Sequence, residues 1–323
     1  MNIGIIGTGA RSTDYLKLLL EHPDFQSHRV TALCDCDEGR LEAYAGFFFG
    51  ETGPALYTDY RRLLADAEVQ AVLITTPDGA HLEIALAAME AGKHILLEKP
   101  MECSAARALA LYEKGRTYTK TLMMGFVLRY AAVYERVQSL LRDGAVGDIV
   151  TVQAAEKLGY RHAASFMRRW HRFTENSGGM MNTKCCHDMD IYTWLLGKKC
   201  KAISSVGDTH LFKKECAPEG ATPYCLGGCK AKENCKVDAE KIYITNPATG
   251  IRNGNTWMAG VACGVNPTEE RTYEALKNGQ YGRCVYMCDN NVVDHQQTNL
   301  LFEDGTTMSF TMCAFTEKCY RYF

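Results

Sequence analysis

The stretch Gly7-Thr8-Gly9-Ala10-Arg11-Ser12 decides the fold of this chain. It follows the apolar run Asn2–Ile6, which predicts a β-strand, and it opens an amphipathic helical pattern. The first glycine permits a tight turn and the second lets the backbone approach a pyrophosphate, while the helix N-terminus supplies N–H groups and a positive dipole end. Ser12 stands where Gly or Ala is usual, a departure that can loosen helix–strand packing. The stretch predicts a dinucleotide-binding turn, and a glycine turn without a ligand is the alternative.

Short apolar runs alternate with helical patterns through the first 125 residues. The further predicted strands are Arg29–Cys34, Val69–Ile74, His94–Leu97 and Thr121–Met124. Helical patterns at Asp14–His22 and His81–Glu90 lie between the strands. Strands that alternate with helices predict a doubly wound parallel sheet, so we assign residues 1–123 to a Rossmann domain in an α/β protein.

The pattern changes near residue 123, and residues 124–323 form a second predicted domain. It begins with a helix around residues 133–141 and a strand near Asp148–Ala155, and a further helix is expected at Cys186–Leu196. After Cys200 the pattern is typical of antiparallel strands, with Asp304-Gly305 as a hairpin turn. Helices and antiparallel strands together predict an α+β domain.

Composition narrows the class of protein. The 323 residues contain 36 Lys and Arg against 38 Asp and Glu, for a formal charge of −2, and 46% are hydrophobic. A nearly neutral chain without a basic block gives no reason to expect nucleic acid or a membrane surface as partner. No apolar run approaches a membrane span, and since Met1 leads directly into Asn2–Ile6 we expect no signal peptide. We therefore expect a cytoplasmic, globular protein.

Asp35 closes the second predicted strand, where a carboxylate accepts hydrogen bonds from the adenosine ribose and repels a 2′-phosphate. Asp35 favours NAD, although Arg40 nearby keeps NADP open.

At the carboxyl end of the third predicted strand lies the stretch Thr75-Thr76-Pro77-Asp78-Gly79-Ala80-His81. Open α/β sheets bind ligands at this edge, so we expect Thr75, Thr76, Pro77 and His81 to line the nicotinamide half of the cofactor site. A plain strand-to-helix loop is the alternative.

Glu98-Lys99-Pro100 follows the strand His94–Leu97, again at a carboxyl edge. Glu98 and Lys99 are therefore placed near the cofactor. A lysine there can hold a substrate hydroxyl and shuttle its proton, particularly where burial lowers its pKa. A surface lysine is the alternative.

These motifs, together with Gly92-Lys93-His94-Ile95-Leu96-Leu97 before Glu98 and Gly125-Phe126-Val127-Leu128-Arg129-Tyr130, resemble the glucose–fructose oxidoreductase/inositol dehydrogenase/MocA family over nearly the whole chain. The resemblance implies a C-terminal domain with an open, mainly antiparallel sheet. It also implies NAD(P)-dependent oxidation of a secondary alcohol of a sugar or cyclitol, or reduction of the ketone, with Arg129 among the substrate contacts.

The family's second signature is an Asp and a His four residues apart after a Gly-Gly pair, with another Asp three residues beyond. Here it reads Gly178-Gly179-Met180-Met181-Asn182-Thr183-Lys184-Cys185-Cys186-His187-Asp188-Met189-Asp190. His187 and Asp190 match, but Thr183 replaces the first Asp. The Lys-Cys-Cys-His-Asp run resembles a subgroup of the family. On a single helix Thr183, Lys184, His187 and Asp188 would share one face.

The resulting hypothesis assigns His187 as general base and Lys99 as the group that stabilises the developing alkoxide. Thr183 and Lys184 are expected to contact the substrate, and a core histidine and a solvated lysine are the alternatives. Other functions remain open: a non-catalytic ligand-binding regulator on the same fold, a glycosidase that uses NAD transiently, and a redox- or metal-responsive protein.

Four arginines and two histidines lie within Arg161–Arg172. Arg168 and its neighbours suit a clamp for a carboxylate or phosphate, which would suggest an acidic substrate, and a solvated, partner-paired loop is the alternative. Tyr160 and Trp170 suit stacking on a sugar face, or packing.

The cysteine pattern is unusual, with fifteen in the chain. Cys216, Cys225, Cys229 and Cys235 lie within twenty residues, and four thiolates suit a structural zinc or an iron–sulfur cluster. The spacing is not that of a paired knuckle, so free thiols and disulfides stay open.

The chain ends at Phe323 inside a predicted strand, and we expect that the sequence is truncated there. The resemblance implies a homo-oligomer, dimer or tetramer, formed through the sheet of the C-terminal domain.

Overall fold

The computed structural model describes residues 1–323, and the chain divides into two compact units. The first contains Met1–Gly125 and Ala239–Gly279, and the second contains Phe126–Asp238 and Gln280–Phe323. The first break lies close to the predicted one at residue 123. The sequence pattern did not indicate that residues 239–279 group with the N-terminal part.

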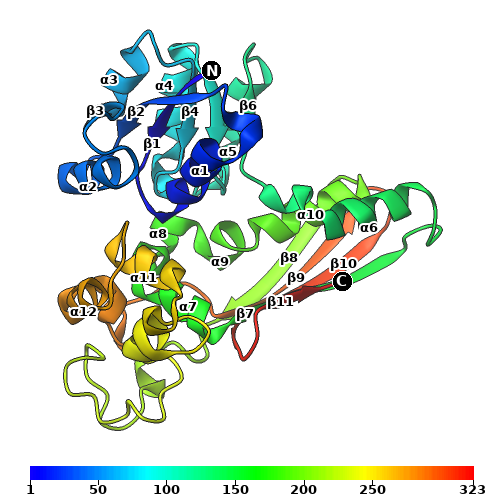
Figure 1. Ribbon diagram of the computed structural model, residues 1–323. Helices are drawn as coiled ribbons and strands as arrows, with labels where there is room; N and C mark the ends of the chain where they lie inside the picture. The colour runs from blue at the N-terminus through cyan, green and yellow to red at the C-terminus, as the bar shows by residue number, and fades with distance from the viewer. The chain divides into compact units, whose positions relative to one another are not determined.

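The first unit contains a six-stranded parallel sheet in the order β3-β2-β1-β4-β5-β6, flanked by helices (Figure 1). Its strands are β1 (Asn2–Ile6), β2 (Arg29–Cys34), β3 (Ala55–Tyr57), β4 (Ala71–Ile74), β5 (His94–Leu97) and β6 (Leu122–Met124). Its helices are α1 (Ala10–Glu21), α2 (Glu38–Phe49), α3 (Tyr60–Ala65), α4 (His81–Glu90), α5 (Ala105–Arg116), α11 (Thr256–Cys263) and α12 (Glu269–Asn278), with shorter turns η1 (Pro23–Phe25), η2 (Asp78–Ala80), η6 (Lys241–Thr245) and η7 (Ile251–Asn253). The strand order runs outward from β1 in both directions, which confirms the doubly wound prediction.

Alternation along the central strands builds one core on each face of this sheet. Ile5 pairs in register with Leu33 of β2 and Leu73 of β4, and all three belong to one buried cluster. The next residue of each strand, as in Ile6 and Ile74, belongs to the cluster on the opposite face. Successive side chains of a strand point to opposite faces, so strands covered on both sides read as continuous apolar runs. Burial on both faces fixes the positions at which the strands end, and the candidate site is built there.

The second unit contains a five-stranded sheet in the order β11-β7-β10-β9-β8. Its strands are β7 (Thr151–Gly159), β8 (Cys200–Asp208), β9 (His295–Phe302), β10 (Thr307–Thr316) and β11 (Tyr320–Tyr322). Its helices are α6 (Ala132–Arg142), α7 (Tyr160–Arg168), α8 (Thr174–Ser177), α9 (Gly179–Thr183) and α10 (Cys186–Leu196), with turns η3 (Val127–Tyr130), η4 (Trp170–Arg172), η5 (Lys214–Cys216), η8 (Gln280–Gly282) and η9 (Val285–Met287). All pairings are antiparallel except β10 with β7, so the sheet is mainly antiparallel as expected. In Figure 1, α6 and α10 lie along the sheet.

Most predicted elements appear within a few residues of their expected bounds. Helix α10 and strands β1, β2 and β5 match, whereas β4 begins at Ala71 rather than Val69. The hairpin turn at Asp304-Gly305 is confirmed, because β9 and β10 pair on either side of it and Gly305 has a φ of +90°. Strand β3 was missed because only three residues form it.

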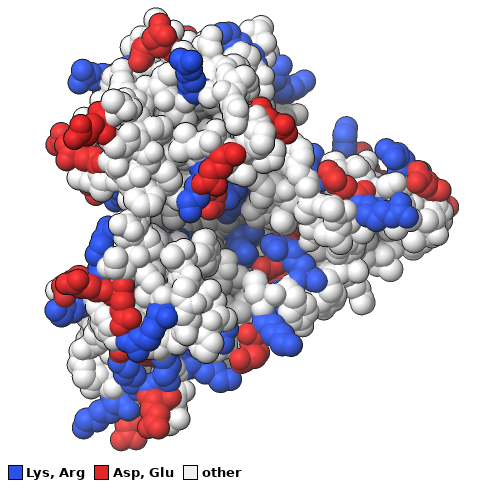
Figure 2. All heavy atoms as spheres, in the orientation of Figure 1, with Lys and Arg blue, Asp and Glu red and all other residues white.

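The surface agrees with the charge balance. Figure 2 shows acidic and basic side chains interspersed over the face drawn, as a formal charge of −2 leads one to expect. No helix in the chain is both long enough and apolar enough to cross a membrane.

Candidate functional site

The turn between β1 and α1 requires its first glycine. Gly7 has a φ of +95°, and a Cβ there would lie 2.9 Å from the backbone of Thr75 and Thr76. The Thr75 hydroxyl donates to the Gly7 carbonyl at 2.7 Å. Gly9 is the N-cap of α1 and has open space where a Cβ would stand, which leaves room for a ligand at the helix N-terminus.

Ser12 adapts to the third motif position. Its side chain is fully buried and its hydroxyl donates to the Gly9 carbonyl at 2.7 Å. A buried hydroxyl with a partner carries no desolvation penalty comparable to that of an unpaired one. The departure from Gly or Ala is therefore accommodated within the turn.

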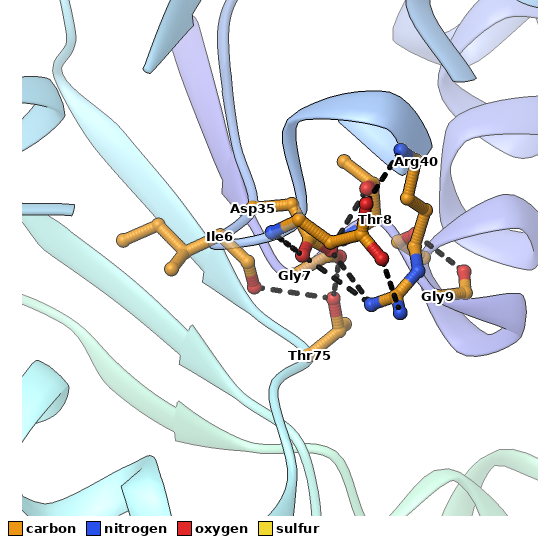
Figure 3. A network of polar contacts seen from close by, with 9 residues as sticks. Ile6, Gly7, Thr8, Gly9, Asp35, Arg40 and Thr75 are labelled. Atoms are coloured by element: carbon orange, nitrogen blue, oxygen red, sulfur yellow. Dashed lines mark hydrogen bonds and ion pairs between the residues drawn. The ribbon is translucent and has the colours of Figure 1, made fainter. Parts of the chain in front are cut away.

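Both carboxylate oxygens of Asp35 accept hydrogen bonds from neighbouring residues (Figure 3). Its Oδ2 accepts from the Thr8 N–H and hydroxyl, each at 2.9 Å, and its Oδ1 accepts from the Asp37 N–H at 3.0 Å. The guanidinium of Arg40 lies 3.3 Å from Oδ1. Burial alone would raise the pKa of Asp35, but the hydrogen bonds from Asp37 and Thr8 and the charge of Arg40 outweigh it and lower the pKa. The carboxylate at the end of β2 is thus ionised at neutral pH.

Glu98 connects α1 with the segment that carries Lys99. Its Oε1 accepts from Arg11 Nε at 2.6 Å and from the Tyr15 hydroxyl at 2.7 Å, and its Oε2 accepts from the Lys99 N–H at 3.0 Å. A Cβ at Gly125 would stand 3.1 Å from this carboxyl group. Glu98, predicted as a cofactor contact, is therefore bonded within the protein on both oxygens.

The loop after β4 lies beside this segment. His81 is fully buried, with its Nδ1 2.8 Å from the Pro100 carbonyl oxygen and its Nε2 3.1 Å from the Thr76 carbonyl oxygen. The hydroxyl of Thr76 is buried without a hydrogen-bond partner. Such an orphaned polar atom at the carboxyl edge of the sheet fits a site completed by a ligand.

In the second unit His187 lies in the first turn of α10, half-buried. The ring of Phe126 meets it edge-on, with centroids 6.1 Å apart. Thr183 is fully buried at the end of α9, and the chain leaves helical hydrogen bonding between α9 and α10. Thr183 and Lys184 therefore do not lie on one continuous helix with His187 and Asp188, because α9 ends at Thr183, Lys184 lies in the turn that follows, and α10 begins at Cys186.

Lys184 belongs to a buried charge cluster, which we define as Glu156, Lys184, Asp188 and Arg321. Lys184 Nζ lies 3.4 Å from Glu156 Oε1, and Arg321 Nε lies 2.9 Å from Glu156 Oε2 and 2.7 Å from Asp188 Oδ1. Both carboxylate side chains are fully buried. Burial raises the pKa of Glu156 and of Asp188, and the two cations oppose the rise. Sequence reasoning missed Glu156 and Arg321, which lie far from the signature along the chain.

Arg129 is paired in a similar way. Its Nε and Nη2 bond to Oδ2 and Oδ1 of Asp190 at 2.8 and 2.5 Å. This two-pronged pair joins the predicted substrate contact to the last Asp of the signature. The Arg129 charge is therefore compensated by a carboxylate of the protein.

Comparisons with known proteins identify the family to which this chain belongs. Residues 1–126 match the oxidoreductase family with an NAD-binding Rossmann fold, and residues 134–232 match the GFO/IDH/MocA C-terminal domain. The chain belongs to the GFO/IDH/MocA family.

Similar curated proteins include inositol 2-dehydrogenase 2 of Saccharopolyspora erythraea, 31% identical over 201 residues, which are 62% of this chain and 55% of the relative. Inositol 2-dehydrogenase of Gluconacetobacter diazotrophicus is also 31% identical, over 61% of this chain and 54% of that protein. This chain spans a little over half the length of these relatives.

Solved structures share the fold. Levoglucosan dehydrogenase in complex with NADH and levoglucosan superposes with a TM-score of 0.67 at 19% identity, over 100% of this chain and 69% of that one. Scyllo-inositol dehydrogenase from Lactobacillus casei, with NAD(H) and scyllo-inositol bound, gives 0.65 at 17% identity, over 100% and 76%.

The arginine-rich stretch Arg161–Arg172 was predicted as a possible anion clamp, but the structure disperses its arginines. Arg168 is fully buried and donates to the backbone carbonyls of Val237 and Arg283. Arg172 bonds to Asp289, while Arg161 and Arg169 lie over the rings of Tyr160 and Phe166. Trp170 stacks on His171 with centroids 3.5 Å apart. The bland alternative, a partner-paired segment, describes these contacts.

The predicted metal site is not supported. None of the fifteen cysteines is in a disulfide, and no group of three or more His, Cys, Asp or Glu side chains is placed to hold a metal ion. Cys216 donates to the His210 carbonyl, and Cys225 accepts from the buried Arg168. Burial raises the pKa of Cys235. Cys216, Cys225, Cys229 and Cys235 thus do not converge as thiolates on one point, although their spacing suggested it.

A pocket of about 500 Å³ lies in the second unit next to the His187 turn. It is lined by Phe126, Met181, Asn182, Cys186, Met189, Asp190, Thr193, Ile203, Ser205, Gln296 and Thr298. Its lining combines sulfur-containing and other apolar side chains with hydroxyls and amides, and Gln296 donates to Ser205 at 2.8 Å. Its single carboxylate, Asp190, is neutralised by Arg129. A pocket of this kind suits a neutral ligand with apolar and hydroxylated faces.

Proposed function

We propose that the chain is an NAD-dependent oxidoreductase that transfers hydride between a secondary alcohol of a sugar, cyclitol or derivative and nicotinamide. The observation that supports this proposal is the Gly7 turn at the start of α1, bonded through Thr8 to the ionised Asp35, in a member of this family, with Lys99 just after the end of β5. The similar proteins named above are inositol and levoglucosan dehydrogenases. Because this chain spans only part of them, its own activity needs a direct test.

The residues present fit NAD. The Gly7 turn, the open N-terminus of α1, the ionised Asp35 and the orphaned Thr76 hydroxyl each meet a need of a dinucleotide. Ionised Asp35 would accept from ribose hydroxyls and favours NAD, while Arg40 beside it offers a partner for the 2′-phosphate of NADP. The bound cofactor would supply the hydride acceptor.

The chain's own residues would accept the proton of the substrate hydroxyl and stabilise the negative charge that develops on its oxygen. His187 would take the hydroxyl proton, and Lys99 would hold the oxygen as it gains negative charge. Since Thr183 replaces the family's carboxylate and Lys184 is paired with Glu156, a substrate hydroxyl would meet a neutral hydroxyl at this position instead of a carboxylate.

The proposed substrate is a neutral polyol. The arginines that suggested an acidic substrate have protein partners or lie over rings. The pocket beside His187 has no Lys, Arg or His in its lining. An uncharged ring with hydroxyl groups would suit this mixed apolar and polar lining, whereas a carboxylate or phosphate would find no cation in it.

The test is reduction of NAD and NADP by purified protein, followed by absorbance, with inositols, neutral sugars, levoglucosan, uronates and phosphosugars. We expect turnover with neutral polyols, a loss of about 100-fold or more in Lys99→Ala, and an NAD dissociation constant changed by less than about threefold. Lys114→Ala removes an exposed lysine of α5 and is the matched control.

Turnover of Lys99→Ala within about tenfold of wild type, roughly 1.4 kcal/mol of barrier, would refute the role of Lys99. Aglycone release from glycosides without net NADH would favour a glycosidase with transient oxidation. NAD binding without any turnover would favour a regulator. The expected homo-oligomer stays a prediction, which sedimentation measurements can decide.

A further inference from the structure

Two loops at the carboxyl edge of the parallel sheet meet at the start of α4. One follows β4 and contains Thr76, and the other follows β5 and contains Lys99 and Pro100. His81, the first residue of α4, lies between them and is fully buried. Its Nδ1 is 2.8 Å from the Pro100 carbonyl oxygen and its Nε2 is 3.1 Å from the Thr76 carbonyl oxygen.

The chemistry of the ring limits these contacts. A carbonyl oxygen only accepts, and a neutral imidazole carries one N–H. Neutral His81 therefore donates to one of the two carbonyls, and only the imidazolium donates to both. Burial lowers the pKa of His81, while the two carbonyls and the nearby charges of Glu102 and Glu98 oppose this. The shorter contact, to the Pro100 carbonyl, points to Nδ1 as the nitrogen that carries the proton in the neutral form.

A second bond fastens the same turn of α4 to the same segment. The Leu82 N–H donates to Glu102 Oε2 at 3.1 Å, and the Cys103 N–H donates to Glu102 Oε1 at 2.7 Å. Arg107 pairs with this carboxylate at 3.1 Å. Glu102 is 2% exposed. His81 and Leu82, which are consecutive in α4, thus bond to Pro100 and Glu102 in the segment that directly follows Lys99.

We propose that His81 is a positioning residue for Lys99, which it holds through the Pro100 carbonyl with its Nδ1–H. This rests on the proposed function, because Lys99 must act on substrate for its position to matter. His81 was expected from the sequence to line the cofactor site. With both ring nitrogens against backbone carbonyls, it acts instead on the backbone that presents Lys99, and Thr76 is its second, weaker anchor.

Two substitutions separate the two contacts. His81→Asn places an amide N–H near the position of Nδ1 and keeps the bond to Pro100, whereas His81→Gln places one near Nε2 and keeps the bond to Thr76. We expect His81→Asn to keep kcat within about fivefold of wild type and His81→Gln to lower it by about 50-fold or more. The NAD dissociation constant should stay within about threefold in both. His94→Asn, at the opposite end of β5, should match wild type.

The tautomer has its own readout, independent of turnover. ¹⁵N NMR of the wild-type imidazole should show His81 protonated on Nδ1 at neutral pH, with a hydrogen-bonded proton. Equal kcat losses in the Asn and Gln variants, losses that follow the NAD dissociation constant, or protonation on Nε2 would each overturn the proposal. A wild type without turnover on any substrate would refute the proposed function, and the positioning role would fall with it even if the Nδ1–H bond were observed.

Discussion

One buried polar site in each unit illustrates a different way of stabilising polar residues. In the first unit Asp35 accepts from the backbone N–H groups of Thr8 and Asp37, and both ring nitrogens of His81 lie against backbone carbonyls. In the second unit the buried charge cluster joins side chain to side chain, from β7, α10, β11 and the link before α10. Backbone partners follow from where strands end, whereas side-chain partners depend on the packing of distant segments. The first arrangement can be read from a local motif and the second cannot.

The largest effect should come from the backbone of the first unit. Gly7→Ala puts a Cβ 2.9 Å from the Thr75 backbone at a positive φ. We expect a loss of about 3 kcal/mol in unfolding free energy, by urea denaturation, and no measurable NAD binding.

Gly9→Ala is the matched variant, since no atom lies within 4 Å of a Cβ there. Its unfolding free energy should stay near that of wild type, while its affinity for NAD should fall because the methyl group takes the space of the ligand. A destabilised Gly9→Ala, or a Gly7→Ala that binds NAD normally, would contradict this account of the turn.

The charge cluster should give the next largest effect. Arg321→Met leaves the buried carboxylates of Glu156 and Asp188 without their shared cation. We expect a loss of about 3 kcal/mol in unfolding free energy. Arg136→Met removes an exposed arginine of α6 and should change it by less than about 0.5 kcal/mol. Equal unfolding free energies for the two variants would contradict a stabilising role of Arg321 in the buried charge cluster.

The smallest expected effect is on how the unfolding free energy changes with pH, which should differ in sign between Asp35 and Glu156. The pKa of Asp35 is lowered by folding, so its stabilising contribution is present above the unfolded value near 4 and is lost as pH falls through the folded value. The pKa of Glu156 is raised, so the folded state binds the proton more tightly and its contribution grows as pH falls through the raised value.

Unfolding free energies of wild type, Asp35→Asn and Glu156→Gln between about pH 7 and pH 2 test this contrast, because Asp35 loses its contribution only below about pH 4. The difference from wild type should shrink with acid for Asp35→Asn and move in the opposite direction for Glu156→Gln, by about 1.4 kcal/mol for each pKa unit between folded and unfolded states. Slopes of the same sign would remove the contrast between the two units.

The sequence predicted the parallel sheet, the glycine turn, Asp35 and the ends of β4 and β5, because each depends on local pattern and strand alternation. It did not predict that residues 239–279 group with the first unit, nor the partners of Lys184 and Arg168, which come from segments far away along the chain. The zinc prediction rested on cysteine spacing alone. Spacing cannot show whether thiols point toward one another, and here Cys216 and Cys225 bond elsewhere.

Hydride transfer itself is tested most directly with a substrate deuterated at the carbinol carbon. The neutral polyol with the highest turnover is incubated with NAD and protein, and the mass of the reduced cofactor is measured. We predict deuterium in the reduced nicotinamide with wild type, and about 100-fold less deuterated cofactor formed in the same time with Lys99→Ala. Reduced cofactor without deuterium, or deuterium transfer unaffected by Lys99→Ala, would contradict the account.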